Sequence, residues 1–114
     1  MPAKLSLVID CADPATLAEF WAPALGYQNL GAFGSYVALA AEGAPVLLLQ
    51  QVDEPKQGKN RMHLDIKVAD VEAEVDRLVS LGAKRISDAP VEELGARWVV
   101  MNDPEGNEFC VCRD

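Results

Sequence analysis

The sequence predicts an α+β fold made of two copies of one half-domain, because the same pattern of elements occurs twice in the same order. Each copy begins with a strand-like run that leads through Ala-Asp into a helical pattern. Each helical pattern stops at Leu-Gly, and three shorter strand-like runs follow it. Two copies are too few for a solenoid, so each half needs a partner to cover the face of its sheet.

The opening strands are predicted over residues 5–11 and 62–68. Asp13 and Asp70 follow them as natural N-caps, because a short carboxylate accepts hydrogen bonds from the free amides of the first helical turn. Pro14 suits the first position of the first helix. Apolar residues then recur at helical spacing on one stripe of each helix: Leu17, Phe20, Trp21 and Leu25, and Val71, Val75, Leu78 and Val79.

The remaining strands and the linker follow from alternation and from turn residues. After the first helix we expect strands near 28–33, 36–40 and 45–52, and after the second near 84–87, 97–102 and 108–112. Residues 43–45 and 103–107 read as hairpin turns. The predicted organisation is a single domain, 1–114, with module one over 1–53, a polar linker over 54–60 and module two over 61–114.

Composition excludes several classes of protein. The chain has 114 residues, enough for one core, and half of them are apolar. A net charge of −8 with no basic stripe argues against nucleic-acid binding. No apolar run is long enough for a membrane span, and the N-terminus does not resemble a signal peptide. We therefore expect a cytoplasmic protein in which Cys11, Cys110 and Cys112 are free thiols.

Taken in order, these motifs resemble the vicinal oxygen chelate superfamily, which contains glyoxalases, bleomycin-resistance proteins and dioxygenases. The likeness is greatest to small glyoxalase-like proteins of actinobacterial type and covers essentially the whole chain. The matching segments are 10–14, 20–21, 25–27, Gln50, 59–61, 63–65 and 103–110. The resemblance implies two βαβββ modules forming a curved, partly open mixed β-barrel with helices outside, and a homodimer. The superfamily hosts many reactions, so the fold does not fix the function.

The resemblance also implies where a divalent metal would bind, on the first and last strands of each module. Those positions hold Ser6, Gln50, His63 and Cys110 here, and Glu108 lies on the same strand as Cys110 but nearer the turn. This set does not suit Mg²⁺, Mn²⁺ or Ni²⁺. Zinc on His63 and Cys110 lacks a convincing third ligand. We therefore predict no cofactor and regard a divalent metal as the less favoured alternative.

Strand alternation places His63, Asp65 and Lys67 on one face of the second module's first strand. One interpretation is a pocket floor in which Asp65 raises the basicity of His63, giving a general base or a substrate anchor. The other is a solvated face, or an ion pair from Lys67 to Asp10.

Four further residues leave similar alternatives open. Trp98 either packs under a helix or offers a flat wall to a ligand. Cys110 is either a nucleophile or an unreactive buried thiol. Lys59 and Arg61 either meet an anionic substrate or keep the linker soluble.

The leading hypothesis is a small-molecule-binding protein, with metal-independent lyase or isomerase activity carried by His63 and Asp65. The residues expected to bind the substrate are Ser6, Gln50, Lys67, Trp98, Glu108 and Cys110. One alternative is a metal-dependent lyase, isomerase or dioxygenase. Another is a drug-sequestering protein that holds a bulky, often cationic ligand in an acidic cup without chemistry.

Overall fold

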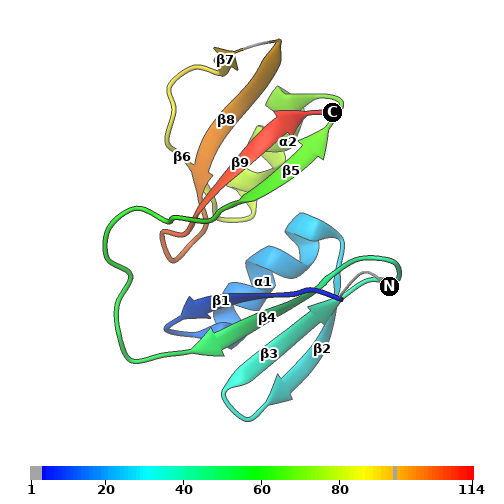
Figure 1. Cartoon of the computed structure of the whole chain (residues 1–114), viewed down its shortest axis with the longest axis vertical. Helices are drawn as coiled ribbons and strands as arrows, with labels where there is room; N and C mark the ends of the chain where they lie inside the picture. The colour runs from blue at the N-terminus through cyan, green and yellow to red at the C-terminus, as the bar shows by residue number, and fades with distance from the viewer. Residues whose placement is uncertain (1–3, 94) are drawn as a thin grey trace. The chain divides into compact units, whose positions relative to one another are not determined.

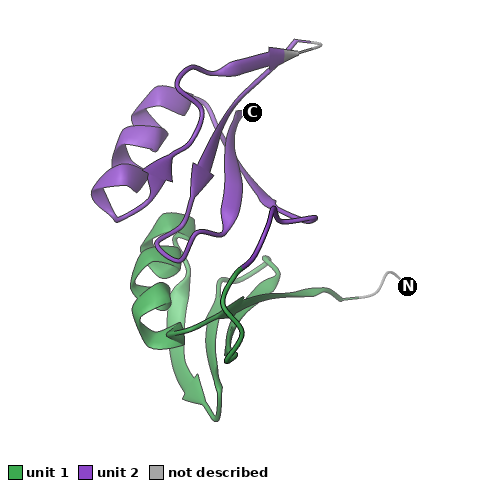
Figure 2. Ribbon diagram, turned by 90° about the vertical axis from the view of Figure 1, so that its left-hand side faces the viewer, with its two compact units in different colours: residues 1–56 green, residues 57–114 purple. Residues whose placement is uncertain are grey.

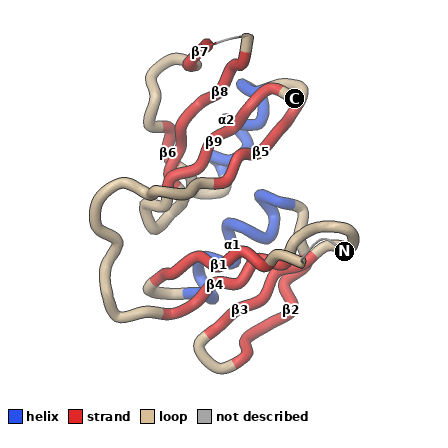
Figure 3. Tube along the Cα trace, in the orientation of Figure 1, coloured by secondary structure: helices blue, strands red, loops and turns tan. Residues whose placement is uncertain are grey.

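The computed structural model describes residues 4–93 and 95–114, and the chain divides into two compact units, 1–56 and 57–114 (Figure 2). Each unit contains one helix and one sheet, and the helix lies against one face of its own sheet (Figure 3). Neither α1 (Pro14–Leu25) nor α2 (Val71–Ser80) has the length and apolar character needed to cross a bilayer, and the described residues form no other helix.

In the first unit, α1 follows β1 (Ser6–Cys11), and three strands follow α1: β2 (Gln28–Phe33), β3 (Tyr36–Ala40) and β4 (Val46–Gln51) (Figure 1). The strand order is β1-β4-β3-β2, with β1 parallel to β4 and the other pairs antiparallel. Trp21, Phe20, Leu39 and Leu47 are fully buried between α1 and this sheet.

In the second unit, α2 follows β5 (Leu64–Val68), and four strands follow α2: β6 (Lys84–Arg85), β7 (Val91–Glu93), β8 (Ala96–Asn102) and β9 (Glu108–Arg113). The order is β5-β9-β8-β6, with β5 parallel to β9, and β7 pairs with β8. The predicted α+β class and the two βαβββ modules are confirmed. Within the described residues each sheet is open at both edges rather than closed on itself.

Two details differ from the sequence predictions. Strand β7 was not predicted, because three residues are too few to show alternation, and it forms by pairing with β8 from Val91↔Trp98 onward. Val79 was expected on the buried stripe of α2, but it is 47% exposed. The stripe is narrower than predicted, and Val71, Val75 and Leu78 are the buried residues of this helix.

Both predicted helix starts are confirmed at the level of hydrogen bonds. The Asp13 side chain accepts a hydrogen bond from the amide of Thr16 at 3.2 Å and one from its hydroxyl at 2.8 Å. Both bonds lower the pKa of the Asp13 carboxyl, and the bond from the Thr16 hydroxyl has the larger effect. Asp70 accepts a hydrogen bond from the amide of Ala73 at 3.1 Å. Gly26 ends α1 with a φ of +69°, a left-handed conformation that favours glycine.

The turn between β8 and β9 is held by a buried carboxylate. Asp103 is 2% exposed, and its side chain accepts hydrogen bonds from the amides of Glu105 and Asn107 and from the Asn107 side chain, each at 2.9 Å. The turn fixes where β9 begins and therefore which residues of β9 face away from α2.

We expect Asp103→Ala to destabilise the protein by about 3 kcal/mol, because it leaves three donors of the turn without their acceptor. The measurement is urea unfolding followed by circular dichroism. Asp88→Ala removes an exposed carboxylate of the same unit and should change the free energy of unfolding by less than about 0.5 kcal/mol. Equal unfolding midpoints for the two variants would contradict this role for Asp103.

Candidate functional site

The second unit carries a hollow of about 520 Å³ over the face of its sheet that does not contact α2. It is formed by β5, β8 and β9 together with residues that precede β5. The lining residues are Lys59, His63, Asp65, Lys67, Ala96, Arg97, Trp98, Val100, Glu108, Cys110, Cys112 and Arg113.

Alternation along the strands decides which side chains line this hollow. On β8 and β9 the residues Val99, Met101, Phe109 and Val111 are completely buried. Their neighbours in sequence point to the opposite face, because successive side chains of a strand alternate. The apolar residues therefore supply the core beneath α2, and the residues between them form the wall of the hollow.

Pairing between strands arranges these residues in rows across the sheet. Asp65 lies opposite Cys110, and Cys110 lies opposite Val100. One step further along, Lys67 lies opposite Cys112, which lies opposite Trp98. Two residues along a strand span about 7 Å, so the second row lies about that far from the first.

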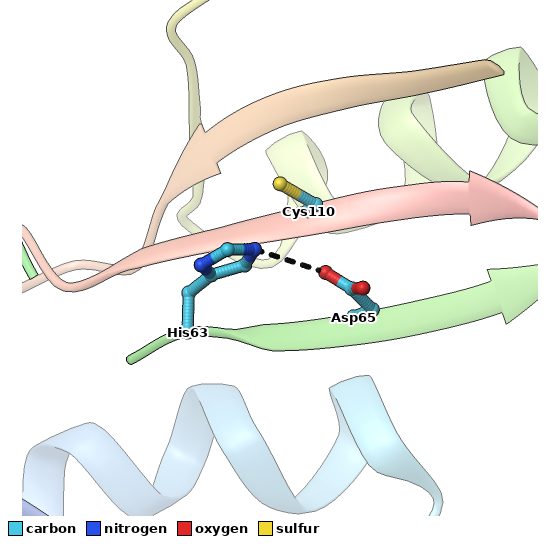
Figure 4. A group of neighbouring side chains, drawn as sticks. All are labelled: His63, Asp65 and Cys110. Atoms are coloured by element: carbon cyan, nitrogen blue, oxygen red, sulfur yellow. Dashed lines mark ion pairs between the residues drawn. The ribbon is translucent and has the colours of Figure 1, made fainter. Parts of the chain in front are cut away.

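His63 and Asp65 form an ion pair at the floor of the hollow. The distance from Nε2 of His63 to Oδ1 of Asp65 is 3.3 Å, and their side chains are 42% and 48% exposed (Figure 4). The carboxylate faces Nε2 of the ring and limits how the imidazole can turn. Because both groups reach solvent, the pair contributes little to stability, and its interest is chemical.

Cys110 lies beside this pair and is 6% exposed. Burial raises the pKa of its thiol to about 11, and the charges of Asp65, Cys112 and Glu108 add to the increase. Burial, followed by Asp65, also raises the pKa of Cys112. Both groups are therefore neutral thiols near pH 7, which favours the unreactive interpretation of Cys110 over the nucleophilic one.

The ligand atoms of His63, Asp65 and Cys110 all lie within 4.8 Å of one another. Asp65 is thus the third donor that sequence reasoning did not find for zinc. A nitrogen, an oxygen and a sulfur donor with an open fourth position suit Zn²⁺, whereas Mg²⁺ prefers a set of oxygens. The residues fit zinc better than the harder cations.

The first module has no equivalent group at the matching positions. When the parallel pairs β1–β4 and β5–β9 are matched by register, His63 corresponds to Ser6, Asp65 to Val8, and Cys110 to Leu48. Gln50 corresponds to Cys112 rather than to Cys110. Imidazole, carboxylate and thiol therefore occur together in the second module only.

The structure groups the predicted site residues unequally. Those of the second module line the hollow: His63, Asp65, Lys67, Trp98, Glu108 and Cys110. Ser6 and Gln50 lie in the first unit, on one face of its sheet, where Ser6 is opposite Val46 and Gln50 is opposite Asp10. Counted along the paired strands β1 and β4, Ser6 and Gln50 are four positions apart. Their part in substrate binding stays a prediction.

Sequence reasoning missed three polar residues of the hollow: Arg97, Cys112 and Arg113. Cys112 could have been found, since it has the parity of Cys110. The two arginines lie at or next to strand ends, where alternation is a weak guide. Lys59 lines the hollow, as contact with an anionic substrate would require, but it forms an ion pair with Glu108. Arg61 is not among the lining residues.

Two βαβββ modules, with a polar hollow on the open face of one sheet, define a glyoxalase-type α+β protein. The family model described as a glyoxalase-like domain matches residues 6–112, so the chain belongs to this family. This match confirms the predicted vicinal oxygen chelate superfamily. No curated protein matches the chain in sequence.

Solved structures support the same fold. A glyoxalase/bleomycin resistance protein/dioxygenase family enzyme from Burkholderia phytofirmans is 20% identical, with a TM-score of 0.83, and covers 97% of this chain and 98% of its own. A member of the same superfamily from Sphaerobacter thermophilus is 17% identical, with a TM-score of 0.76, and covers 100% of this chain and 98% of its own. At these identities the likeness shows the fold and not the reaction.

We expect Cys110 to react with iodoacetamide at pH 8 about a hundred-fold more slowly in the folded protein than in urea. The reason is that each unit of pKa lowers the thiolate population tenfold, and the pKa rises from 9.0 to about 11. The stabilisation by the neutral thiol is full below pH 9 and is lost as pH rises towards 11. Peptide mass spectrometry measures the labelling, and equal rates in the two states would contradict the neutral buried thiol.

Proposed function

We propose that this protein binds a small molecule in the hollow of its second module and moves a proton on it, as a lyase or isomerase does. The observation that carries the proposal is the His63–Asp65 pair, 3.3 Å apart, on the floor of a hollow beside Trp98. Lyases and isomerases commonly begin by removing a proton from carbon, and an imidazole held by a carboxylate is suited to that step.

The geometry of the pair supports a separate role for each atom. Nε2 of His63 faces Asp65 at 3.3 Å, so in the proposed reaction the ring proton is on Nε2 and the lone pair is on Nδ1. In the proposed reaction Nδ1 takes the proton from the substrate, and Asp65 stabilises the imidazolium that forms. The same nitrogen then returns the proton to another atom of the substrate, which completes an isomerisation, or to the leaving group, which completes an elimination.

Three further groups support substrate binding in this hollow. Trp98 is half-buried and offers an aromatic surface, while Lys67 and Glu108 offer charges of opposite sign. Lys59 forms an ion pair with Glu108, which holds this side of the hollow together. A protein that only sequesters its ligand would need the same wall but not the His63–Asp65 pair, so turnover separates the two alternatives.

The proton-transfer proposal is tested with 5-nitrobenzisoxazole, a flat probe whose ring opens to a coloured phenolate when a base removes one proton. We expect the protein to accelerate this opening and His63→Ala to reduce the rate at least about a hundred-fold, the size of a general-base contribution. Asp65→Asn should give a smaller loss. His63 is the only histidine, so its NMR titration should coincide with the pH profile of the rate.

Asp76→Asn is the matched control, since it removes an exposed carboxylate on α2, outside the lining of the hollow. It should leave the rate unchanged. Retention of the full rate by His63→Ala, with the fold intact by circular dichroism, would remove the proton-transfer role and leave a binding protein.

A zinc-dependent enzyme of the same family is the second candidate, and the group of three donors within 4.8 Å favours it. His63, Asp65 and Cys110 would hold the ion. When bound, zinc would act as a Lewis acid towards an oxygen of the substrate. A neutral imidazole has one ring lone pair, which either binds zinc or takes a proton, so the two candidates exclude each other.

Elemental analysis of protein purified without chelators separates the candidates. The proton-transfer proposal predicts much less than one zinc per chain, and it predicts that Cys110→Ala retains the benzisoxazole activity within about two-fold, because removing a neutral thiol leaves the base in place. One zinc per chain that disappears in Cys110→Ala, with loss of activity, would establish the second candidate instead.

The homodimer and the cytoplasmic location expected from the sequence belong to this proposal. All six residues of the edge strand β2 are exposed, which supports an interface there. The three free thiols support a reducing compartment. Sedimentation velocity would decide the oligomeric state.

A further inference from the structure

The hollow of the second module differs in charge from the protein as a whole. The chain has a net charge of −8. The residues that line the hollow nevertheless include four with cationic side chains, Lys59, Lys67, Arg97 and Arg113, and two with carboxylates, Asp65 and Glu108. Arg97 and Arg113 have the strand parity of the buried Val99 and Val111, so Lys59 and Lys67 are the cations on the open face, where positive and negative charges balance.

Most of the charges in this lining are already paired. Lys59 forms an ion pair with Glu108, and Arg97 forms one with Glu92 at 3.2 Å. Asp65 is engaged by His63. On the open face one charged side chain remains, that of Lys67, which makes no ion pair with any described residue of this unit.

Lys67 lies at the end of the hollow that holds Trp98. Lys67, Cys112 and Trp98 form one row across β5, β9 and β8. Adjacent strands are about 4.8 Å apart, so the backbone of Lys67 is about 10 Å from that of Trp98. A ligand of modest size can meet a positive charge and an aromatic surface at the same time.

The neighbouring row contains the groups of the proposed reaction. Asp65 and Cys110 lie about 7 Å along the strands from Lys67 and Cys112, and His63 lies beside Asp65. A ligand held at the Lys67 row would therefore have to extend about 7 Å along the strands to reach the row of the imidazole.

We propose that the ligand of this hollow is a small organic anion with a flat apolar part. Its carboxylate or other acidic group binds Lys67, its flat part lies against Trp98, and its reacting carbon faces His63. The inference rests on the small-molecule binding proposed above but not on the proton-transfer step. It is the opposite of the cationic ligand that the net charge suggests, because net charge averages over the whole surface.

The test is a titration of ¹⁵N-labelled protein with three probes of one shape and different charge: 2-naphthoate, 2-naphthamide and 2-naphthylmethylammonium. We expect 2-naphthoate to shift the amide signals of β5, β8 and β9 and to bind at least about five-fold more tightly than the neutral amide. The cation should bind more weakly than both. Added salt should reduce the preference for the anion.

The variants identify the groups responsible. Lys67→Gln should weaken 2-naphthoate binding about three- to five-fold and leave 2-naphthamide binding unchanged. Lys84→Gln is the matched control, because it makes the same change in net charge on β6, outside the lining of the hollow. It should leave both affinities unchanged.

Equal or tighter binding of the cation, or equal effects of Lys67→Gln and Lys84→Gln, would overturn the anion assignment. The absence of any probe-induced shift on β5, β8 and β9 would overturn it as well. These outcomes are separate from the proton-transfer test, because the benzisoxazole probe is uncharged and reports on His63. Either proposal can therefore fail while the other stands.

Discussion

The alternation of side chains along three strands is the constraint on which the rest of this structure depends. On β5, β8 and β9 every second residue is committed to the core beneath α2, and Val99, Met101, Phe109 and Val111 have no exposed surface. The residues between them must face the other way, whatever their chemistry. A shift of one residue in any pairing would bury His63 and Asp65 and expose the core, so packing beneath the helix fixes the site above it.

Duplication of the scaffold allows the candidate site to occupy one module only. Both modules place a strand, a capped helix and a parallel partner strand in the same register, so each offers the same three positions on its open face. In the first module those positions hold Ser6, Val8 and Leu48, which cannot exchange a proton near neutral pH or bind zinc strongly. The scaffold is therefore retained twice, while its titratable groups are concentrated in the second copy.

Sequence reasoning could predict the elements because their signals are local. Asp13 and Asp70 mark helix starts through hydrogen bonds to residues three positions away. The parity of His63, Asp65 and Lys67 likewise follows from one strand alone. The grouping of Cys110 with Asp65 could not be predicted, because it depends on the register between β5 and β9. The row of Lys67, Cys112 and Trp98 could not be predicted for the same reason.

The three groups at the floor of the hollow have competing uses, and the environment of Cys110 favours one of them. Burial and nearby negative charge raise the pKa of this thiol to about 11, so without a bound cation the sulfur keeps its proton near neutral pH. The neutral thiol presents an apolar wall to the ligand beside His63. Asp65 then has one close partner, the imidazole of His63. The positive charge of Lys67, which the anion is proposed to bind, lies one row away and does not compete for the Asp65 carboxylate.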